Sequence, residues 1–400
     1  MPLTSASFVV VAMLVAQTIV SMGTLTLPSI APALARAFEV DASAIGYQIS
    51  IVYAGAMASA ALGGSVVQRI GAGRTTQTAL LAIAAGMALG TSASIATLMI
   101  ASLLIGLGYG LSNPAAAELL VRYTPASRRN LIFSLKQTGV PLGGMAAAMV
   151  APGIASTFGW RAALLLVTAL AIAMVVLLQF PRGRWDQRSG RPLPLSWAQV
   201  FDGISLIWRE PPLRYLSLMA LCFAGVQLCL MTFTVTLLVA ESGYSLVQAG
   251  LVLSVVQLAG AVGRIVWGWA ADRTRSSTSV LIALGAIMLV ANLAVTRIDA
   301  GWSAAWILFV FVAMGSTAIG WNGVFLAEVA RLASTSHAST ATGGALFFTF
   351  AGVLLGPSAF AAVYGHLQSY TGTFVVAAIL AAIGIGLAAL SRACRTPPRS

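Results

Sequence analysis

Residues 332–391 read LASTSHASTATGGALFFTFAGVLLGPSAFAAVYGHLQSYTGTFVVAAILAAIGIGLAALS and contain no Asp, Glu, Lys or Arg. A helix needs about 20 apolar residues to cross a bilayer, so this stretch is long enough for two spans. Charge-free stretches also cover 1–35, 75–117 and 215–240. They are continuously apolar, whereas barrel strands alternate polar and apolar residues. The sequence therefore predicts an all-α membrane protein.

Composition supports this prediction. The 400 residues are 59% hydrophobic and 8% charged, against about 25% charged in soluble domains. The first apolar stretch lacks a basic start and is too long for the apolar part of a signal peptide, so we read it as the first span. We predict twelve transmembrane helices at 8–30, 45–67, 76–95, 97–121, 131–156, 160–180, 214–240, 246–271, 278–298, 303–329, 341–366 and 371–392.

The arginines are distributed unevenly across the predicted membrane. Most fall in alternate loops or in the tail, and only Arg36, Arg161 and Arg297 fall on the other side. This is the positive-inside bias, and it places both termini and the long central loop in the cytoplasm. It also explains the net charge of +12 without nucleic acid. We expect an integral protein of a bacterial cytoplasmic (inner) membrane, monomeric in the lipid bilayer.

One substantial break interrupts the apolar pattern, at 181–213. It is rich in proline and arginine, and apolar residues recur at helical spacing over 197–208 after Ser196, a plausible N-cap. We predict an amphipathic helix on the cytoplasmic membrane surface; a soluble linker helix is the alternative. The predicted organisation is an N-terminal six-helix bundle (1–180), this central loop (181–213) and a C-terminal six-helix bundle (214–400).

The two predicted bundles repeat one another in sequence. The segment Gly64-Ser-Val-Val-Gln-Arg69 matches Gly268-Trp-Ala-Ala-Asp-Arg273, and Gly139-Val-Pro-Leu-Gly143 matches Gly352-Val-Leu-Leu-Gly356. Internal repeats in a membrane chain are typical of transporters, whose site lies between the repeats.

The chain resembles the major facilitator superfamily in three features. They are two sets of six spans, a basic central loop and a Gly-x-x-x-(Asp)-Arg turn after spans two and eight. The first turn carries Gln68 where that family usually has Asp, which weakens the inferred gate in this half; the second keeps Asp272. The resemblance implies a cytoplasmic gate made of Arg69, Arg74, Arg122, Asp272, Arg273, Glu328 and Arg331.

Two carboxylates near the cytoplasmic ends of spans have arginines nearby in sequence. Glu118 precedes Arg122 by four residues, and Glu328 precedes Arg331 by three. We predict that these are ion pairs of the inner gate or of the scaffold. Proton coupling is a second interpretation of Glu118.

Two cations are predicted to lie inside the membrane. Lys136, the only lysine, falls about six residues into span five, roughly 9 Å deep. A buried cation costs at least about 2.5–3.5 kcal/mol and normally faces a partner or a cavity; snorkelling to the interface is the alternative. Arg264 precedes Asp272 by eight residues in span eight. This pattern resembles the oxalate and monocarboxylate carriers, in which an arginine before the turn binds the substrate carboxylate; an internal ion pair is the alternative.

We expect Lys136 and Arg264 to approach one another at similar depth and to require an anion between them. Polar and aromatic residues on spans four, eight and ten would complete the pocket, although helix-packing hydrogen bonds explain each one equally well. They are Tyr109, Asn113, Gln257, Trp321 and Asn322. The glycines of span four, such as Gly106, Gly108 and Gly110, are expected to permit close helix packing.

The predicted function is secondary transport of a small organic anion, a carboxylate by preference, by alternating access with inward proton symport. The chain has no G-x-x-x-x-G-K-[ST] loop, so ATP is not the driver. We expect no cofactor, no metal and no enzymatic activity. One alternative is a drug or metabolite exporter, because Gly139–Gly144 loosely resembles the antiporter motif G-P-x-x-G-G. A second is a carrier of an inorganic anion such as nitrate or cyanate, and a third is a transporter-like receptor.

Overall fold

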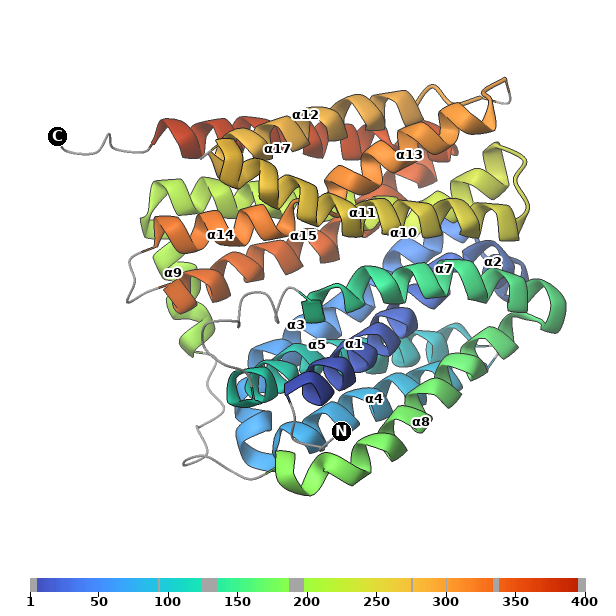
Figure 1. The fold of residues 1–400 in the computed structure, drawn as a ribbon. Coiled ribbons are helices and arrows are strands. Elements are labelled where there is room, and N and C mark those ends of the chain that lie inside the picture. The colour runs from blue at the N-terminus through green and yellow to red at the C-terminus, as the bar shows by residue number, and fades with distance from the viewer. Residues whose placement is uncertain are drawn as a thin grey trace. The chain divides into compact units, whose positions relative to one another are not determined.

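The computed structural model describes residues 6–92, 94–123, 135–186, 198–274, 276–299, 301–333 and 338–394. Within these ranges the chain is helical, with turns between the helices and no β-strand. It divides into two compact units, unit 1 (Met1–Ser196) and unit 2 (Trp197–Ser400). The helices of each unit run side by side as long rods (Figure 1).

Unit 1 contains the helices of the first six predicted spans. They are α1 (Ala6–Ser29), α3 (Ile45–Ile70), α4 (Ala72–Leu89), α5 (Ile95–Tyr123), α7 (Gly139–Phe158) and α8 (Trp160–Trp185), with a short α2 (Ala31–Phe38) and a 3-10 turn (Ala42–Ala44) after α1. Leu135, Lys136 and Gln137 are also helical and join α7 through a turn at Thr138. Each predicted span of this half therefore corresponds to a helix.

Unit 2 contains the helices of the last six predicted spans. They are α10 (Pro211–Glu241), α11 (Leu246–Thr274), α12 (Ser277–Val295), α13 (Ala304–Ala318) with α14 (Asn322–Leu332), α15 (Ala338–Leu367), and α16 (Tyr370–Thr373) with α17 (Val375–Ala393). The predicted span 303–329 is thus broken in two at 319–321. The two pieces together still form one apolar segment long enough to cross a membrane, Ala304–Val329, as the sequence predicts.

Ten helices within the described residues are long and apolar enough to cross a membrane. Helices α3 and α4 are not among the ten, although they fill the predicted spans 45–67 and 76–95. For α4 the reason is visible in its first turns, where Arg74-Thr-Thr-Gln-Thr78 lowers the hydropathy of a short helix. The predicted all-α membrane fold is confirmed.

The helices of the two units pack in the same order. In unit 1, α1 packs against α7, α3 against α5, and α4 against α8. The corresponding pairs of unit 2 are α10 with α15, α11 with α13, and α12 with α17. The sequence repeat is therefore a repeat of structure.

Glycines allow the closest of these contacts. A Cβ on Gly106 would collide with the Val52 carbonyl of α3, and one on Gly108 would meet the Ala79 carbonyl of α4. Gly143 of α7 similarly lies against the Thr18 carbonyl of α1. The packing role predicted for the span-four glycines is confirmed, and the exporter-like Gly139–Gly144 segment forms the seam between α1 and α7.

The predicted amphipathic helix is present as α9 (Ala198–Arg209). It packs against the first turns of α15, where Gly344 leaves room for the Gly203 carbonyl and the Trp208 and Phe348 rings stack at 6.4 Å. The predicted N-cap, Ser196, lies outside the described residues.

Helix α8 ends later than predicted. It runs through Pro181 to Trp185, where the expected span ended at residue 180. Trp185 is 1% exposed, and its ring lies 6.1 Å from that of Phe8 in α1. Burial of this tryptophan stabilises the additional helical turn.

Candidate functional site

Lys136 is buried in unit 1 with an exposed fraction of 3%. Its Nζ donates to Gln17 Oε1 at 2.7 Å, to Asn113 Oδ1 at 2.5 Å and, more weakly, to Gln137 Oε1 at 3.4 Å. We call these three residues the amide cradle. The ammonium is therefore held inside the unit, and the snorkelling alternative does not describe this structure.

The amide cradle joins three segments that are far apart in sequence. Gln17 lies on α1, Asn113 on α5, and Gln137 beside the lysine itself. Gln17 is 1% exposed, donates its Nε2 to Ser21 at 3.1 Å and accepts a second hydrogen bond from Ser112 at 3.3 Å. Gln137, by contrast, is exposed. Two of the three contacts are thus fixed from neighbouring helices and one is peripheral.

No carboxylate of unit 1 compensates the charge of Lys136. The unit has four, Glu39, Asp41, Glu118 and Asp186, and all are among the described residues. None forms an ion pair with the lysine, since the salt bridges of the described chain are Arg74–Asp186, Arg182–Asp186 and Arg331–Glu328. Neutral amide oxygens satisfy the hydrogen-bonding capacity of the ammonium but leave its positive charge.

Tyr109 lies one turn before Asn113 on α5. Its ring packs edge-on against Tyr53 of α3 at 5.6 Å, and its carbonyl accepts from Ser112 at 2.7 Å. Tyr109 is 9% exposed. Of the predicted pocket residues in unit 1, the structure therefore brings Asn113 to Lys136 directly, while Tyr109 is linked to the cradle through Ser112.

In unit 2, Arg264 lies beside the break between α13 and α14. Helix α13 ends at Ala318, and Ile319, Gly320 and Trp321 form a turn. The Ile319 carbonyl, freed from the helical ladder, accepts from Arg264 Nε at 3.2 Å. Broken helices of this kind leave backbone groups available for ligands and ions in membrane transporters.

Close packing between α11 and α13 places Arg264 at this break. A Cβ on Gly263 would collide with the Ser316 carbonyl, and one on Gly260 would meet Ile319 Cβ at 2.5 Å. The Ser316 carbonyl also accepts from Trp267 Nε1 at 2.9 Å. The glycine-rich part of α11 thus sets the arginine against the turn.

Trp321 and Asn322 follow the break and share one partner. Trp321 Nε1 donates to Gln227 Oε1 at 3.2 Å, and Asn322 Nδ2 lies 3.5 Å from the same oxygen. Gln227 comes from α10. The fifth predicted pocket residue, Gln257 of α11, is 1% exposed, and its Oε1 has no hydrogen-bond partner among the described residues.

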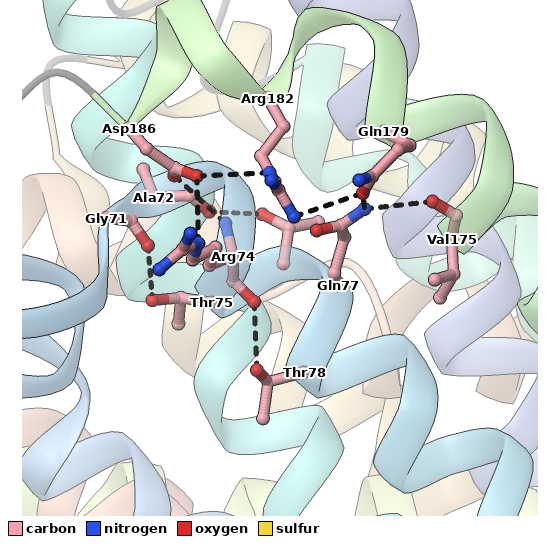
Figure 2. A network of polar contacts seen from close by, with 11 residues as sticks. Gly71, Ala72, Arg74, Thr75, Gln77, Thr78, Val175, Gln179, Arg182 and Asp186 are labelled. Atoms are coloured by element: carbon pink, nitrogen blue, oxygen red, sulfur yellow. Dashed lines mark hydrogen bonds and ion pairs between the residues drawn. The ribbon is translucent and has the colours of Figure 1, made fainter.

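Arg74, one of the residues predicted for the cytoplasmic gate, lies in the first turn of α4 within a network of polar contacts (Figure 2). Asp186, just after α8, accepts the backbone N–H of Arg74 at 3.0 Å, and its second oxygen lies 3.8 Å from Arg74 Nε and 3.9 Å from Arg182 Nε. A carboxylate at a helix N-terminus satisfies a free N–H and is favoured by the helix dipole. Gly71, at φ +93°, has no room for a Cβ beside this carboxylate.

The predicted ion pair between Glu118 and Arg122 is wrong. Both side chains are exposed, and no salt bridge within 4.0 Å joins them in the described chain. Arg122 lies instead over the ring of Tyr123 at 5.6 Å. The physical reason is that an exposed i,i+4 pair gains only about 0.3–0.5 kcal/mol and loses side-chain entropy. Arg69, at the end of α3, is exposed as well.

The second predicted pair, Glu328 with Arg331, is confirmed. Glu328 is 0% exposed and accepts from Arg331 Nε at 2.9 Å and Nη2 at 2.7 Å, as well as from Thr278 of α12 at 3.1 Å. Asp272 and Arg273, by contrast, are exposed at the end of α11. Neither takes part in an ion pair among the residues that the structure describes.

Sequence reasoning missed three residues of these clusters, namely Gln17, Gln227 and Asp186. Each could have been noticed as an isolated polar residue. Gln17 and Gln227 interrupt long apolar runs at a cost that hydrogen bonding must offset, and Asp186 is the one acid among the arginines of 181–191. The i,i+4 spacing of Arg182 and Asp186 predicts their contact, whereas sequence spacing does not connect Gln17 with Lys136 or Gln227 with Trp321.

Comparison with known proteins agrees with this fold. Residues 13–357 match the family profile of the Major Facilitator Superfamily. Monocarboxylate transporter 13 of Rattus norvegicus is 28% identical over 360 residues, 88% of this chain and 80% of that protein. The 4-hydroxybenzoate transporter PcaK of Pseudomonas aeruginosa is 27% identical over 274 residues, 61% of each chain.

Among solved structures, an inward-facing bacterial homologue of the human lysosomal transporter Spinster superposes with a TM-score of 0.80. The match is 17% identical and covers 100% of this chain and 99% of that one, so it bears on the fold alone. With two units whose helices pack in the same order, ten apolar helices among the described residues and a family match over most of its length, this chain is a membrane transporter that belongs to the Major Facilitator Superfamily.

Proposed function

We propose that this protein is a secondary transporter that imports small organic carboxylates together with protons by alternating access. The observation that carries the proposal is the buried ammonium of Lys136, whose three partners are neutral amide oxygens. A cation kept at this cost in the membrane interior normally serves a ligand. A carboxylate would provide the counter-charge.

Arg264 is proposed as the second cationic group. Guanidinium matches carboxylate geometry through two parallel hydrogen bonds, whereas an ammonium acts as a point charge. Its position beside a broken helix supports this role. The transport activities named for two relatives, of monocarboxylates and of 4-hydroxybenzoate, support the same substrate class.

Proton coupling follows from energetics. The cell interior is negative, so an anion alone is driven outward by about 2.3 kcal/mol per charge per 100 mV. Symported protons offset this term. We propose the cytoplasmic membrane, with both termini inside and one chain per transporter, as the setting.

The test is uptake into proteoliposomes of labelled 4-hydroxybenzoate, lactate and nitrate, with and without an inward proton gradient. We expect uptake of a carboxylate that the gradient stimulates. Arg264→Lys should impair binding strongly because it keeps the charge but loses the planar fork, while Lys136→Arg should be milder. Arg264→Gln should lose about 1.5–3 kcal/mol of anion affinity.

Three outcomes would overturn the proposal or part of it. Uptake of nitrate but of neither carboxylate identifies an inorganic anion carrier. Outward transport of an apolar dye in exchange for protons identifies an exporter. Full carboxylate binding by Arg264→Gln removes that residue from the site.

A further inference from the structure

Gln17 is the best-anchored member of the amide cradle. Its oxygen accepts from Lys136 and Ser112, and its nitrogen donates to Ser21, so both ends of the amide are fixed. Gly139 of α7 lies directly on it, because an added Cβ there would meet Gln17 Cβ at 2.9 Å. The side chain is 1% exposed. It therefore has one position, and that position determines where the ammonium lies.

The choice of an amide at position 17 has an electrostatic consequence. A glutamate there would hold the ammonium equally well but would neutralise it, and a buried pair of that kind has no need of an anion. A methionine would fill the space but provide no acceptor. Glutamine alone of these three fixes the ammonium and leaves its charge.

We propose that Gln17 is the positioning residue of the anion site, fixing Lys136 Nζ between α1 and α5 while leaving its positive charge for the substrate. This inference rests on the proposed function. It assigns a role in substrate affinity to a residue that need not touch the substrate.

The chain offers an unusually direct readout, because Lys136 is its only lysine. Full-length protein labelled with lysine carrying ¹³C at Cε gives one lysine signal in an NMR spectrum. We would compare the wild type with Gln17→Met, Gln17→Glu and Gln48→Met. Gln48 is the matched control: it is a buried glutamine of the same unit, on α3, that donates to Ser102 of α5 at 2.8 Å and contacts no cation within the described part of the chain.

Without ligand, Gln17→Met should shift or broaden the lysine signal, and Gln48→Met should leave it at the wild-type position. With 4-hydroxybenzoate, the wild-type signal should move on titration. Gln17→Glu should keep one sharp signal that no longer responds. In uptake assays, KM for the carboxylate should rise at least about tenfold in Gln17→Met, the effect of one charged hydrogen bond, with kcat changed less.

The proposal is overturned if Gln17→Met and Gln48→Met give the same lysine signal and the same KM as the wild type. It is also overturned if Gln17→Glu responds to 4-hydroxybenzoate as the wild type does. If Gln17→Met fails to fold, the Gln17→Glu titration still decides. Failure of the proposed function looks different: the wild-type signal then ignores every carboxylate, while the ligand-free effect of Gln17→Met persists.

Discussion

The ion pair between the buried Glu328 and the exposed Arg331 allows a quantitative prediction for the substitution Arg331→Met. Glu328 is 0% exposed and receives two hydrogen bonds from the guanidinium, whereas the Arg331 side chain is 58% exposed. Removing the arginine thus costs little burial of its own. It leaves a buried carboxylate that keeps the hydrogen bond from Thr278 but has lost both hydrogen bonds from the guanidinium.

Breaking a buried pair by removing one partner costs about 3–5 kcal/mol. At about 2–4 °C per kcal/mol for a unit of some 200 residues, Tm should fall by about 6–20 °C. Hydrogen bonding to Glu328 raises the pKa of Arg331 above its usual value. The guanidinium therefore stays charged at neutral pH, and its contribution to stability is lost as pH rises through that raised pKa.

The assay is thermal unfolding of the purified protein in detergent. Arg74→Met is the matched control, because Arg74 is 56% exposed and lies 3.8 Å from Asp186; we expect a loss of at most about 1 kcal/mol. The double change Glu328→Gln with Arg331→Met should recover most of the lost stability, since a neutral amide needs no counter-charge. Equal Tm values for Arg331→Met and Arg74→Met would refute the reasoning.

Four further predictions concern single positions. Asp186→Ala should lower the free energy of unfolding by about 0.5–2 kcal/mol, as loss of an N-cap does. Asp186→Asn should lower it less, because the amide oxygen still accepts from the Arg74 N–H. Thermal unfolding measures both variants. Gly263→Ala should lower the free energy of unfolding by about 1–3 kcal/mol, because the added methyl group collides with the Ser316 carbonyl. The change in Tm measures this loss. Asp272→Asn should slow uptake without abolishing binding, which separate binding and uptake assays resolve. Arg191→Cys should resist an impermeant thiol reagent in intact cells and react after lysis; labelling without lysis would reverse the proposed orientation.

The helices were predictable because hydropathy is a local property of the chain. A run such as 215–240 must be helical in lipid whatever its neighbours are. The break at 319–321 was not predictable, since no proline marks it. It depends on Gly320 packing beside Trp267 of α11, a contact that no spacing rule describes.

The site was predictable in its charges and not in its contacts. The depth of Lys136 followed from counting residues into a span, and burial at 3% exposure agrees with it. Its strongest partners are 119 and 23 residues away in sequence, on helices whose rotation is set by packing. For Glu118 the sequence spacing predicted a partner, Arg122, that the structure does not pair with it. The pair is exposed, and an exposed ion pair gains too little energy to hold both side chains in place.

The two units place a similar pair of amides against different donors. Each unit carries a glutamine on its first helix and an asparagine on the helix of its fourth span: Gln17 with Asn113, and Gln227 with Asn322. In unit 2 the glutamine oxygen accepts from the Trp321 indole, a neutral donor. In unit 1 the glutamine oxygen accepts from Ser112 and from the Lys136 ammonium. Amide oxygens accept equally from both donors, so the scaffold tolerates either one. Because amides add no negative charge, the Lys136 ammonium keeps its positive charge in the interior of unit 1, and a carboxylate at position 17 or 113 would neutralise it.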